Sequence, residues 1–274
     1  PLRALTDQVL SQDLAILPSR PIQQRIQGNG GWSEGDAKFS GANPTSGAVF
    51  TYYQPHRHIF GKLRIEVLDA QGKVVDTLPA SKRPGINRVA WSMRAPAPHA
   101  PSAAQIAYAS TQGPRFVPGT YTLRITSDGK VYSQPVTIVP DRRATYTQAD
   151  RQAQFEAAER VSDLFGRMTD LVARINAVRQ GAEARAEALP ESDAFKARLE
   201  ALQAKADVLR KEIVATKEGG AITGEERLRE WTDQLYGGIN SWDGKPSDYQ
   251  VKRIEVLDGL LGGVQQRFAA LVQS

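Results

Sequence analysis

The sequence contains no cysteine, and its 274 residues include only three histidines and two methionines. The absence of cysteine excludes disulfide bonds, thiolate nucleophiles and cysteine-ligated metal sites together. No stretch approaches the roughly 20 consecutive apolar residues that a membrane span requires, so none is expected. The remaining composition, with 41% hydrophobic and 24% charged residues, is that of a globular protein.

The net charge of +5 is unevenly distributed along the chain. Residues 1–144 carry 17 Lys and Arg against 9 Asp and Glu, whereas residues 145–274 carry 18 against 21. Such opposite balances suggest that the two parts attract each other or different surfaces. The basic residues are scattered rather than clustered on one element among aromatic residues, which argues against nucleic-acid binding.

Residues 1–40 are interpreted as a lead-in segment rather than as a domain. A short amphipathic helix at the start would be interrupted by Pro18 and Pro21, and a Gly-rich polar stretch follows. A segment of this length without its own core must pack on the following domain or belong to a domain upstream. Because the chain begins at Pro1 rather than Met, we expect a processed or truncated product.

Residues 41–141 show the period-two alternation of apolar and polar residues that is typical of β-strands. Turn residues at positions 69–72 and 127–129 predict hairpins. Six or seven short strands separated by turns are typical of an immunoglobulin-like β-sandwich. Strands are predicted around residues 49–53, 63–67, 73–78, 89–93, 121–125 and 130–139.

A segment rich in Pro, Ala and Ser interrupts this rhythm between residues 95 and 117. Loops longer than about 15 residues are usually functional or disordered. We therefore interpret this segment as the most flexible candidate for binding.

From residue 142 to residue 274 the apolar residues follow helical spacing. Thr147 or Asp150 can cap a first helix, which is expected to give way around residues 181–190. A second helix is predicted from Ser192, with Phe195 in its apolar seam, followed by a shorter helix and a last helix after Ser247. Seams of this kind predict antiparallel helices packed as a hairpin or bundle. The fold class is therefore predicted to be α+β, with two domains.

Several stretches of the β region resemble a known family. They are Asn43, Pro44, Gly47 and Ala48 followed by Tyr52 and Tyr53, then LRIEVLDAQGKVV, GINRVAWSMR, PGTYTLRITSDGK and PVTIVPDRR. Together they look like the C-terminal region of large exported bacterial proteins that carry sortilin-like or BNR-repeat β-propellers and are often labelled glycosyl hydrolases. The hairpin with PGTYT is also similar to the immunoglobulin-like domain of the flagellar hook-capping family.

The remainder of the chain extends the resemblance. TQADRQAQFEAAERVSDL and LYGGINSWDGKPSDYQ resemble the helical segment that closes those proteins, and PLRALT looks like the exit from a last propeller blade. The resemblance implies an exported location, which could be periplasmic, secreted or at the cell surface. It also implies an upstream β-propeller domain or chain as partner, with other protein components as further candidates. Any catalytic site of the family would lie on the propeller, so none of it transfers to residues here.

Groups that could form a metal site are few. His56 and His58 occupy positions i and i+2, which on a strand would put both imidazoles on one face. Zinc sites need three or four ligands, and no third histidine lies nearby in the sequence. We interpret the pair as surface or turn residues.

A catalytic constellation is equally hard to assemble. Paired carboxylates for glycoside hydrolysis would have to come from scattered acidic residues such as Asp36, Glu66, Asp69 and Asp128. Asp69 and Asp128 lie in predicted turns, where Asp is favoured because it hydrogen-bonds nearby backbone. No G-x-S-x-G motif is present. We therefore predict no catalytic residue, metal site or cofactor, and a hydrolase would require acidic residues converging in one cleft.

Aromatic residues in loops are the remaining candidates for binding. Trp32 and Trp242 lie in predicted loops and Tyr108 lies in the 95–117 segment, so these three are the candidate ligand or interdomain contacts. Trp91 and Trp231 instead fit core positions, which is the commoner role of strand and helix aromatics. The lack of a catalytic constellation predicts a non-catalytic structural or accessory segment, and the resemblance implies that it positions or docks a larger exported propeller protein. The alternative is a carbohydrate-binding module of a glycoside-hydrolase-like protein.

Overall fold

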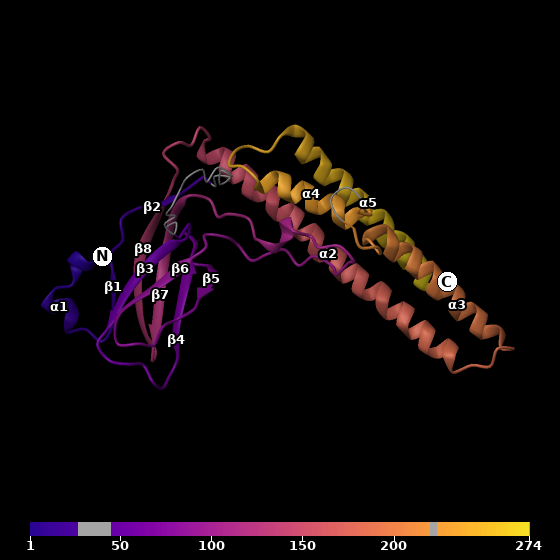
Figure 1. Ribbon diagram of the computed structural model, residues 1–274, viewed down its shortest axis with the longest axis horizontal. Coiled ribbons are helices and arrows are strands. Elements are labelled where there is room, and N and C mark those ends of the chain that lie inside the picture. Colours follow the sequence, from indigo (N-terminus) through magenta and orange to yellow (C-terminus); the bar gives the residue numbers. More distant parts are fainter. Residues whose placement is uncertain (27–44, 220–223, 274) are drawn as a thin grey trace, which may run out of the picture. The chain divides into compact units, whose positions relative to one another are not determined.

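The computed structural model describes residues 1–26, 45–219 and 224–273 (Figure 1). It is an α+β protein in which a β region of two sheets precedes long helices that pack together. The chain forms two compact units, the β unit (residues 1–96 and 115–151) and the helical unit (residues 97–114 and 152–274). The chain therefore passes from one unit to the other three times, and neither unit is one continuous stretch.

The β unit contains two sheets built from eight strands among the described residues. One sheet has the order β1-β3-β6 and the other has the order β2-β8-β7-β4-β5. Neighbouring strands are antiparallel except for β2 and β8, which are parallel. The strands are β1 (Ala15–Leu17), β2 (Ile22–Gln24), β3 (Ala48–Gln54), β4 (Leu63–Leu68), β5 (Val74–Leu78), β6 (Gly85–Trp91), β7 (Gly119–Ser127) and β8 (Lys130–Pro140).

The two predicted hairpins are present, and their turn residues act as expected. The Asp69 carboxylate accepts hydrogen bonds from the main-chain N–H groups of Gln71 and Lys73 at 3.0 and 2.9 Å. Asp128 and Gly129 join β7 to β8 with φ angles of 47° and 82°, the left-handed conformation that a two-residue type I′ turn requires. Both aspartates are therefore turn residues.

The two sheets share one apolar core. Its buried side chains come from both sheets, including Phe50 and Tyr52 on β3, Trp91 on β6, and Leu123 and Ile125 on β7. Trp91 has 0% of its surface exposed, which confirms its predicted core position. Because both sheets contribute to the same cluster, their inner faces pack against each other without a disulfide.

Two strands that the sequence analysis did not predict come from the first 26 residues. Short elements precede them, η1 (Leu2–Ala4) and α1 (Asp7–Leu10). Leu14, just before β1, is 1% exposed and belongs to the core of the β unit. The described part of the lead-in segment thus packs on the β region, because three-residue strands are enough to extend both sheets. Strands this short carry too little alternation to be recognised in sequence.

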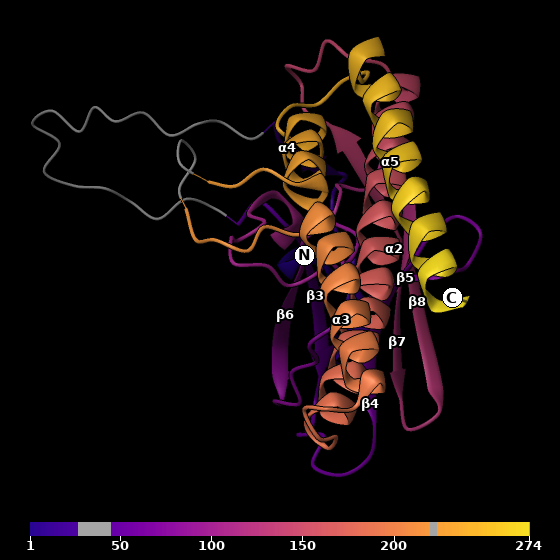
Figure 2. The same ribbon diagram turned by 90° about the vertical axis from the view of Figure 1, so that its right-hand side faces the viewer.

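The described residues of the helical unit form four long helices. They are α2 (Gln148–Glu187, with its first turn counted in the β unit), α3 (Ala194–Ile213), α4 (Leu228–Asn240) and α5 (Asp248–Gln273). Buried side chains of all four form one cluster, which includes the predicted seam of the first helix from Val161 to Ile175. Figure 2 shows α3 and α5 running alongside α2. Thr147 and Asp150 both serve as caps, because each side chain accepts a hydrogen bond from the other residue's main-chain N–H group.

The first helix ends at Glu187, within the predicted break at residues 181–190, and Ala182 and Ala186 near its end pack against Leu199 of α3 in a small second cluster. One detail of the helical prediction is wrong. Phe195 is not part of the apolar seam but is 53% exposed. It lies in the first turn of α3, whereas the first buried residue of that helix is Leu199.

The segment between β6 and β7 is attached to the helices rather than free. Residues 97–114 belong to the helical unit and include a short helix, η2 (Ala109–Thr111). Two side chains of α4, about two helical turns apart, donate hydrogen bonds to the main chain of this segment. Arg229 donates to the carbonyl oxygen of Gln105 at 3.0 Å, and Tyr236 donates to that of Gln112 at 2.9 Å. These hydrogen bonds attach the segment to α4 at two points.

Candidate functional site

The three candidate residues from the sequence do not meet in one place. Trp32 lies outside the described residues. Tyr108 precedes η2 and is 75% exposed, whereas Trp242 follows α4 and is 50% exposed. Only Trp242 borders a pocket between helices, so we build the candidate site from it.

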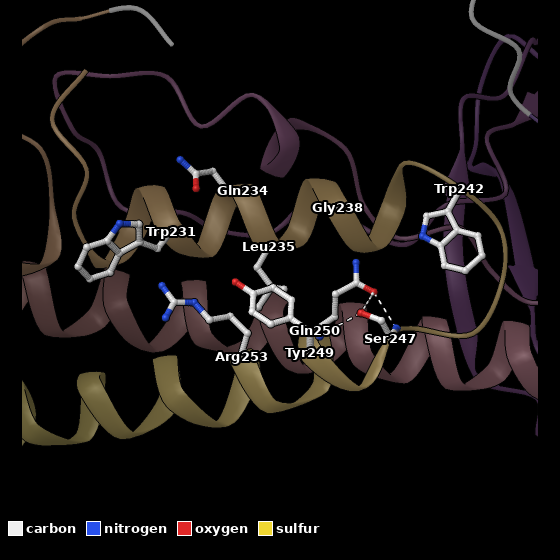
Figure 3. A pocket seen from close by; sticks show the side chains of 9 residues that line it. All are labelled: Trp231, Gln234, Leu235, Gly238, Trp242, Ser247, Tyr249, Gln250 and Arg253. Atoms are coloured by element: carbon white, nitrogen blue, oxygen red, sulfur yellow. Dashed lines mark hydrogen bonds between the residues drawn. The ribbon is translucent and has the colours of Figure 1, made fainter. Parts of the chain in front are cut away.

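That pocket is a groove between α4 and α5, which we call the α4–α5 groove. Its volume is about 440 Å³, within the usual range for small-molecule sites. Figure 3 shows Trp231 at one end and Trp242 at the other, with residues of α5 between them. The lining residues are Trp231, Gln234, Leu235, Gly238, Trp242, Ser247, Tyr249, Gln250 and Arg253.

The buried side-chain amide of Gln154 holds the loop that carries Trp242. Gln154 on α2 is 3% exposed. Its amide nitrogen donates to the carbonyl oxygens of Ile239, at 2.5 Å, and Trp242, and its amide oxygen accepts from the N–H group of Gly244 at 3.2 Å. One side chain therefore satisfies three main-chain groups of the α4–α5 connection, where helix ends otherwise leave them unpaired.

Gly244 leaves the space that the Trp242 ring occupies. A Cβ atom at residue 244 would fall against that ring, so the indole lies directly over the glycine. Half of the indole remains exposed. The ring is thus presented to the groove in a defined position, which lowers the ordering cost of binding a ligand there.

Trp231 forms the other end of the groove. Its indole N–H donates to Glu226 at 3.2 Å, and the guanidinium of Arg253 lies over its ring at 5.7 Å from the ring centre. Trp231 is partly buried against the helical core while it also lines the groove. Trp231 therefore packs against the core, as predicted, and also lines the groove.

Residues at the start of α5 line the groove between the two tryptophans. Ser247 and Gln250 cap the helix reciprocally, because the Ser247 N–H group donates to the Gln250 amide oxygen at 2.9 Å and the Gln250 N–H group donates to the Ser247 hydroxyl at 3.3 Å. Tyr249, which the sequence analysis did not single out, is 72% exposed. One signal could have indicated this site: the family-like stretch LYGGINSWDGKPSDYQ supplies six of the nine lining residues.

The groove offers side chains that can stack and form hydrogen bonds with a ligand. Two indoles and a phenol offer ring faces for stacking, while amide and guanidinium groups offer hydrogen bonds. None of the nine lining residues is an acid or a histidine. Glycoside hydrolysis by general acid–base catalysis requires a pair of carboxyl groups at the reacting bond, which this lining does not supply.

Three of the acidic and histidine side chains considered from the sequence have structural partners: Glu66, His58 and Asp128. Glu66 is 2% exposed and accepts two hydrogen bonds from the Arg124 guanidinium at 3.0 and 2.8 Å. His58 lies 3.6 Å from the Asp128 carboxylate. Asp36 lies outside the described residues. Within the described ranges, no group of three or more metal-ligating side chains comes together.

Comparison with protein-family models, with curated proteins and with solved structures finds no match to this chain. No helix in the part of the chain that the structure describes combines the length and the apolar character needed to span a bilayer.

Proposed function

We propose that this chain is a non-catalytic accessory segment of a larger exported protein, and that it docks that protein through the α4–α5 groove. The observation that carries the proposal is the lining of the groove, which combines a fixed, half-exposed Trp242 with hydrogen-bonding side chains and lacks acid–base groups. An upstream β-propeller is the proposed partner. Support for this partner and for export is the sequence resemblance to proteins that carry sortilin-like or BNR-repeat propellers.

We further propose that the β unit is an immunoglobulin-like sandwich, as in that resemblance. The strand orders support it, because β1, β3 and β6 form one sheet and β2, β8, β7, β4 and β5 form the other. Tyr121 adds a second argument. Near the start of β7, its hydroxyl donates to the carbonyl oxygen of Val117 at 2.7 Å, as the tyrosine corner of such domains does.

The test of docking uses the full chain and the separately produced propeller of its own precursor. A stable complex is expected in size-exclusion chromatography, and we expect Trp242→Ala and Tyr249→Ala to weaken it. Tyr108→Ala is the matched control, because it removes an exposed aromatic of the helical unit outside the groove. A precursor without a propeller, or a complex that both groove variants leave intact, would contradict the proposal. Turnover of a glycoside or peptide by the purified chain would contradict its non-catalytic role.

A carbohydrate-binding module is the second candidate, favoured by the three aromatic residues that line one groove. Stacking on sugar rings would change the emission of Trp242 and Trp231, whereas Trp91 is fully buried and would not respond. Titration of the chain with oligosaccharides should therefore quench or shift tryptophan fluorescence, and Trp242→Ala should abolish the response. A chain whose emission is constant across neutral and acidic oligosaccharides would exclude this candidate.

A further inference from the structure

The loop between β3 and β4 exposes two neighbouring apolar side chains. Phe60 is 86% exposed and Ile59 is 64% exposed. No other large hydrophobic side chain described in the β unit is as exposed as either of them. Single exposed apolar residues are ordinary, but an adjacent pair at the tip of a loop is a contact surface without a partner. We call these two residues the β3–β4 tip.

The tip is held in place on both sides. The N–H group of His58 donates to the carbonyl oxygen of Lys82 at 3.0 Å, and the Lys82 ammonium donates to the carbonyl oxygen of Gly61 at 3.1 Å. Gly61 has a φ of 90°, and a Cβ atom there would fall against the Asp128 carboxylate. The exposed pair is thus presented by a fixed backbone, so little conformational entropy is lost when it makes contact.

Cations surround the tip. Antiparallel pairing brings the 55–62 loop, the 79–84 loop and the β7–β8 turn to one end of the sheets. The two loops carry four cations, none with a carboxylate partner among the described residues. They are Arg57, Lys62, Lys82 and Arg83.

The two acidic groups near this end of the sheets are outnumbered by the four cations, and one of them has a cationic partner. The Asp13 carboxylate accepts from the Lys130 ammonium at 2.6 Å, and Asp128 lies beside His58. The charge around the exposed apolar pair is therefore positive, and the surface that it fits is negative.

From this geometry we propose that the β3–β4 tip inserts Ile59 and Phe60 into the interface of an anionic phospholipid bilayer, with the four cations over the headgroups. A protein partner typically requires about 800 Å² of complementary surface on each side, far more than two side chains supply. A bilayer interface needs no matching shape, accepts a small apolar wedge, and attracts Lys and Arg when its lipids are anionic. The proposal is independent of the α4–α5 groove, which lies in the other unit.

The experiment is co-sedimentation of the full chain with vesicles of phosphatidylcholine alone or of an equimolar mixture with phosphatidylglycerol. Binding is expected to the mixed vesicles and to fall as salt is raised, because salt screens charge attraction. Phe60→Ser should weaken binding by about tenfold or more. The variant loses the favourable free energy of moving one aromatic side chain from water into the apolar part of the bilayer. Phe60→Trp supplies a direct readout, since its emission should shift to the blue only with the anionic vesicles.

Matched variants distinguish insertion of the β3–β4 tip from nonspecific adsorption of the protein to vesicles. Arg57→Gln and Lys62→Gln should each weaken binding by roughly fivefold, whereas Arg198→Gln, an exposed charge on α3, should not. Tyr249→Ser removes an exposed aromatic from the other unit and should leave vesicle binding unchanged. Thermal unfolding of every variant checks that the fold is kept.

Three results would overturn the proposal. They are no binding to the mixed vesicles, equal binding to neutral and anionic vesicles, and binding that Phe60→Ser does not weaken. The first result, combined with capture of the chain by an acidic protein surface through Phe60, would assign the tip to a protein partner instead.

Discussion

The carboxylate of Asp233 on α4 accepts hydrogen bonds from the main-chain N–H groups of Ala109 and Ser110, at 3.3 and 2.9 Å. These are the first two residues of η2, so an acidic side chain binds the unpaired donors at a helix start. The contact joins the segment that leaves the sheets after β6 to a helix more than a hundred residues later in the chain. It attaches a segment with the composition of a free loop to α4.

Asp233→Ala should release this segment. Two charge-assisted hydrogen bonds are lost, and we expect the free energy of unfolding to fall by about 1–3 kcal/mol. Hydrogen exchange of the Ala109 and Ser110 amides should accelerate more than exchange elsewhere. Asp170→Ala, an exposed acidic residue on α2, is the control. Unchanged protection of those two amides in Asp233→Ala would show that Asp233 does not hold the segment.

Two glycines of the helical unit should respond to alanine in opposite directions. Gly244→Ala places a methyl group against the Trp242 ring, and we expect a loss of about 1–3 kcal/mol in stability and a change in tryptophan emission. Gly259→Ala on α5 meets no atom within 4 Å and should stabilise the protein by about 1 kcal/mol, because alanine favours a helix more than glycine does. Denaturant unfolding measures both, and losses of equal size would contradict the placement of the Trp242 ring.

Tyr121→Phe tests the hydrogen bond to Val117 in the β unit. The ring should keep its packing against Trp91, at 5.0 Å between ring centres, so only the hydroxyl contact is lost. We expect destabilisation by about 1 kcal/mol. Burial raises the pKa of Tyr121 to about 12 from its ordinary 10.0, so part of the wild-type stability is lost as pH rises from 10 to about 12. That part should be absent in Tyr121→Phe, as thermal unfolding across the alkaline range would show.

Glu225 should make the helical unit sensitive to acid. The Thr216 N–H group and the Arg227 guanidinium bind its carboxylate and lower its pKa to about 2 from the ordinary 4.5. Because the folded pKa is below the unfolded one, this contribution is complete above pH 4.5 and is lost as the pH falls toward 2.

The measurement for Glu225 is the unfolding midpoint at several pH values in that window. Glu225→Gln should flatten the decline relative to the wild type. Glu218→Gln removes the same charge at an exposed position without breaking a bond to Thr216 or Arg227, and it should keep the decline. Parallel pH profiles for wild type and Glu225→Gln would refute the role of this carboxylate.

Much of the fold could be predicted from the sequence, because the longer strands and the helical seams bury one face each. Phe165 and Trp91 are core residues for that reason. Contacts distant in sequence could not be predicted. The bonds from Asp233 and Arg229 to residues 105–110 join a side chain to main-chain groups, so the sequence of the bound segment carries little trace of them.

The candidate site was predictable only in part, for a related reason. Trp242 stands in a loop between Gly- and Pro-containing turns, which indicated exposure. Trp231 lies in a helical seam and also borders the groove, and helical periodicity cannot distinguish these roles. Tyr249 lies in the first turn of α5, where its exposure depends on how α4 lies beside it.

The three passages of the chain between its units set an order of events during synthesis. Ser110 leaves the ribosome 123 residues before Asp233, the residue that will bind it. At roughly 5–20 residues per second this interval is on the order of ten seconds. Throughout that time β6 can pair with β3, and β7 can pair with β4 and β8, but the main-chain groups of Ala109 and Ser110 lack their acceptor on α4. The residues that connect β6 to β7 thus gain these contacts only after α4 has been synthesised.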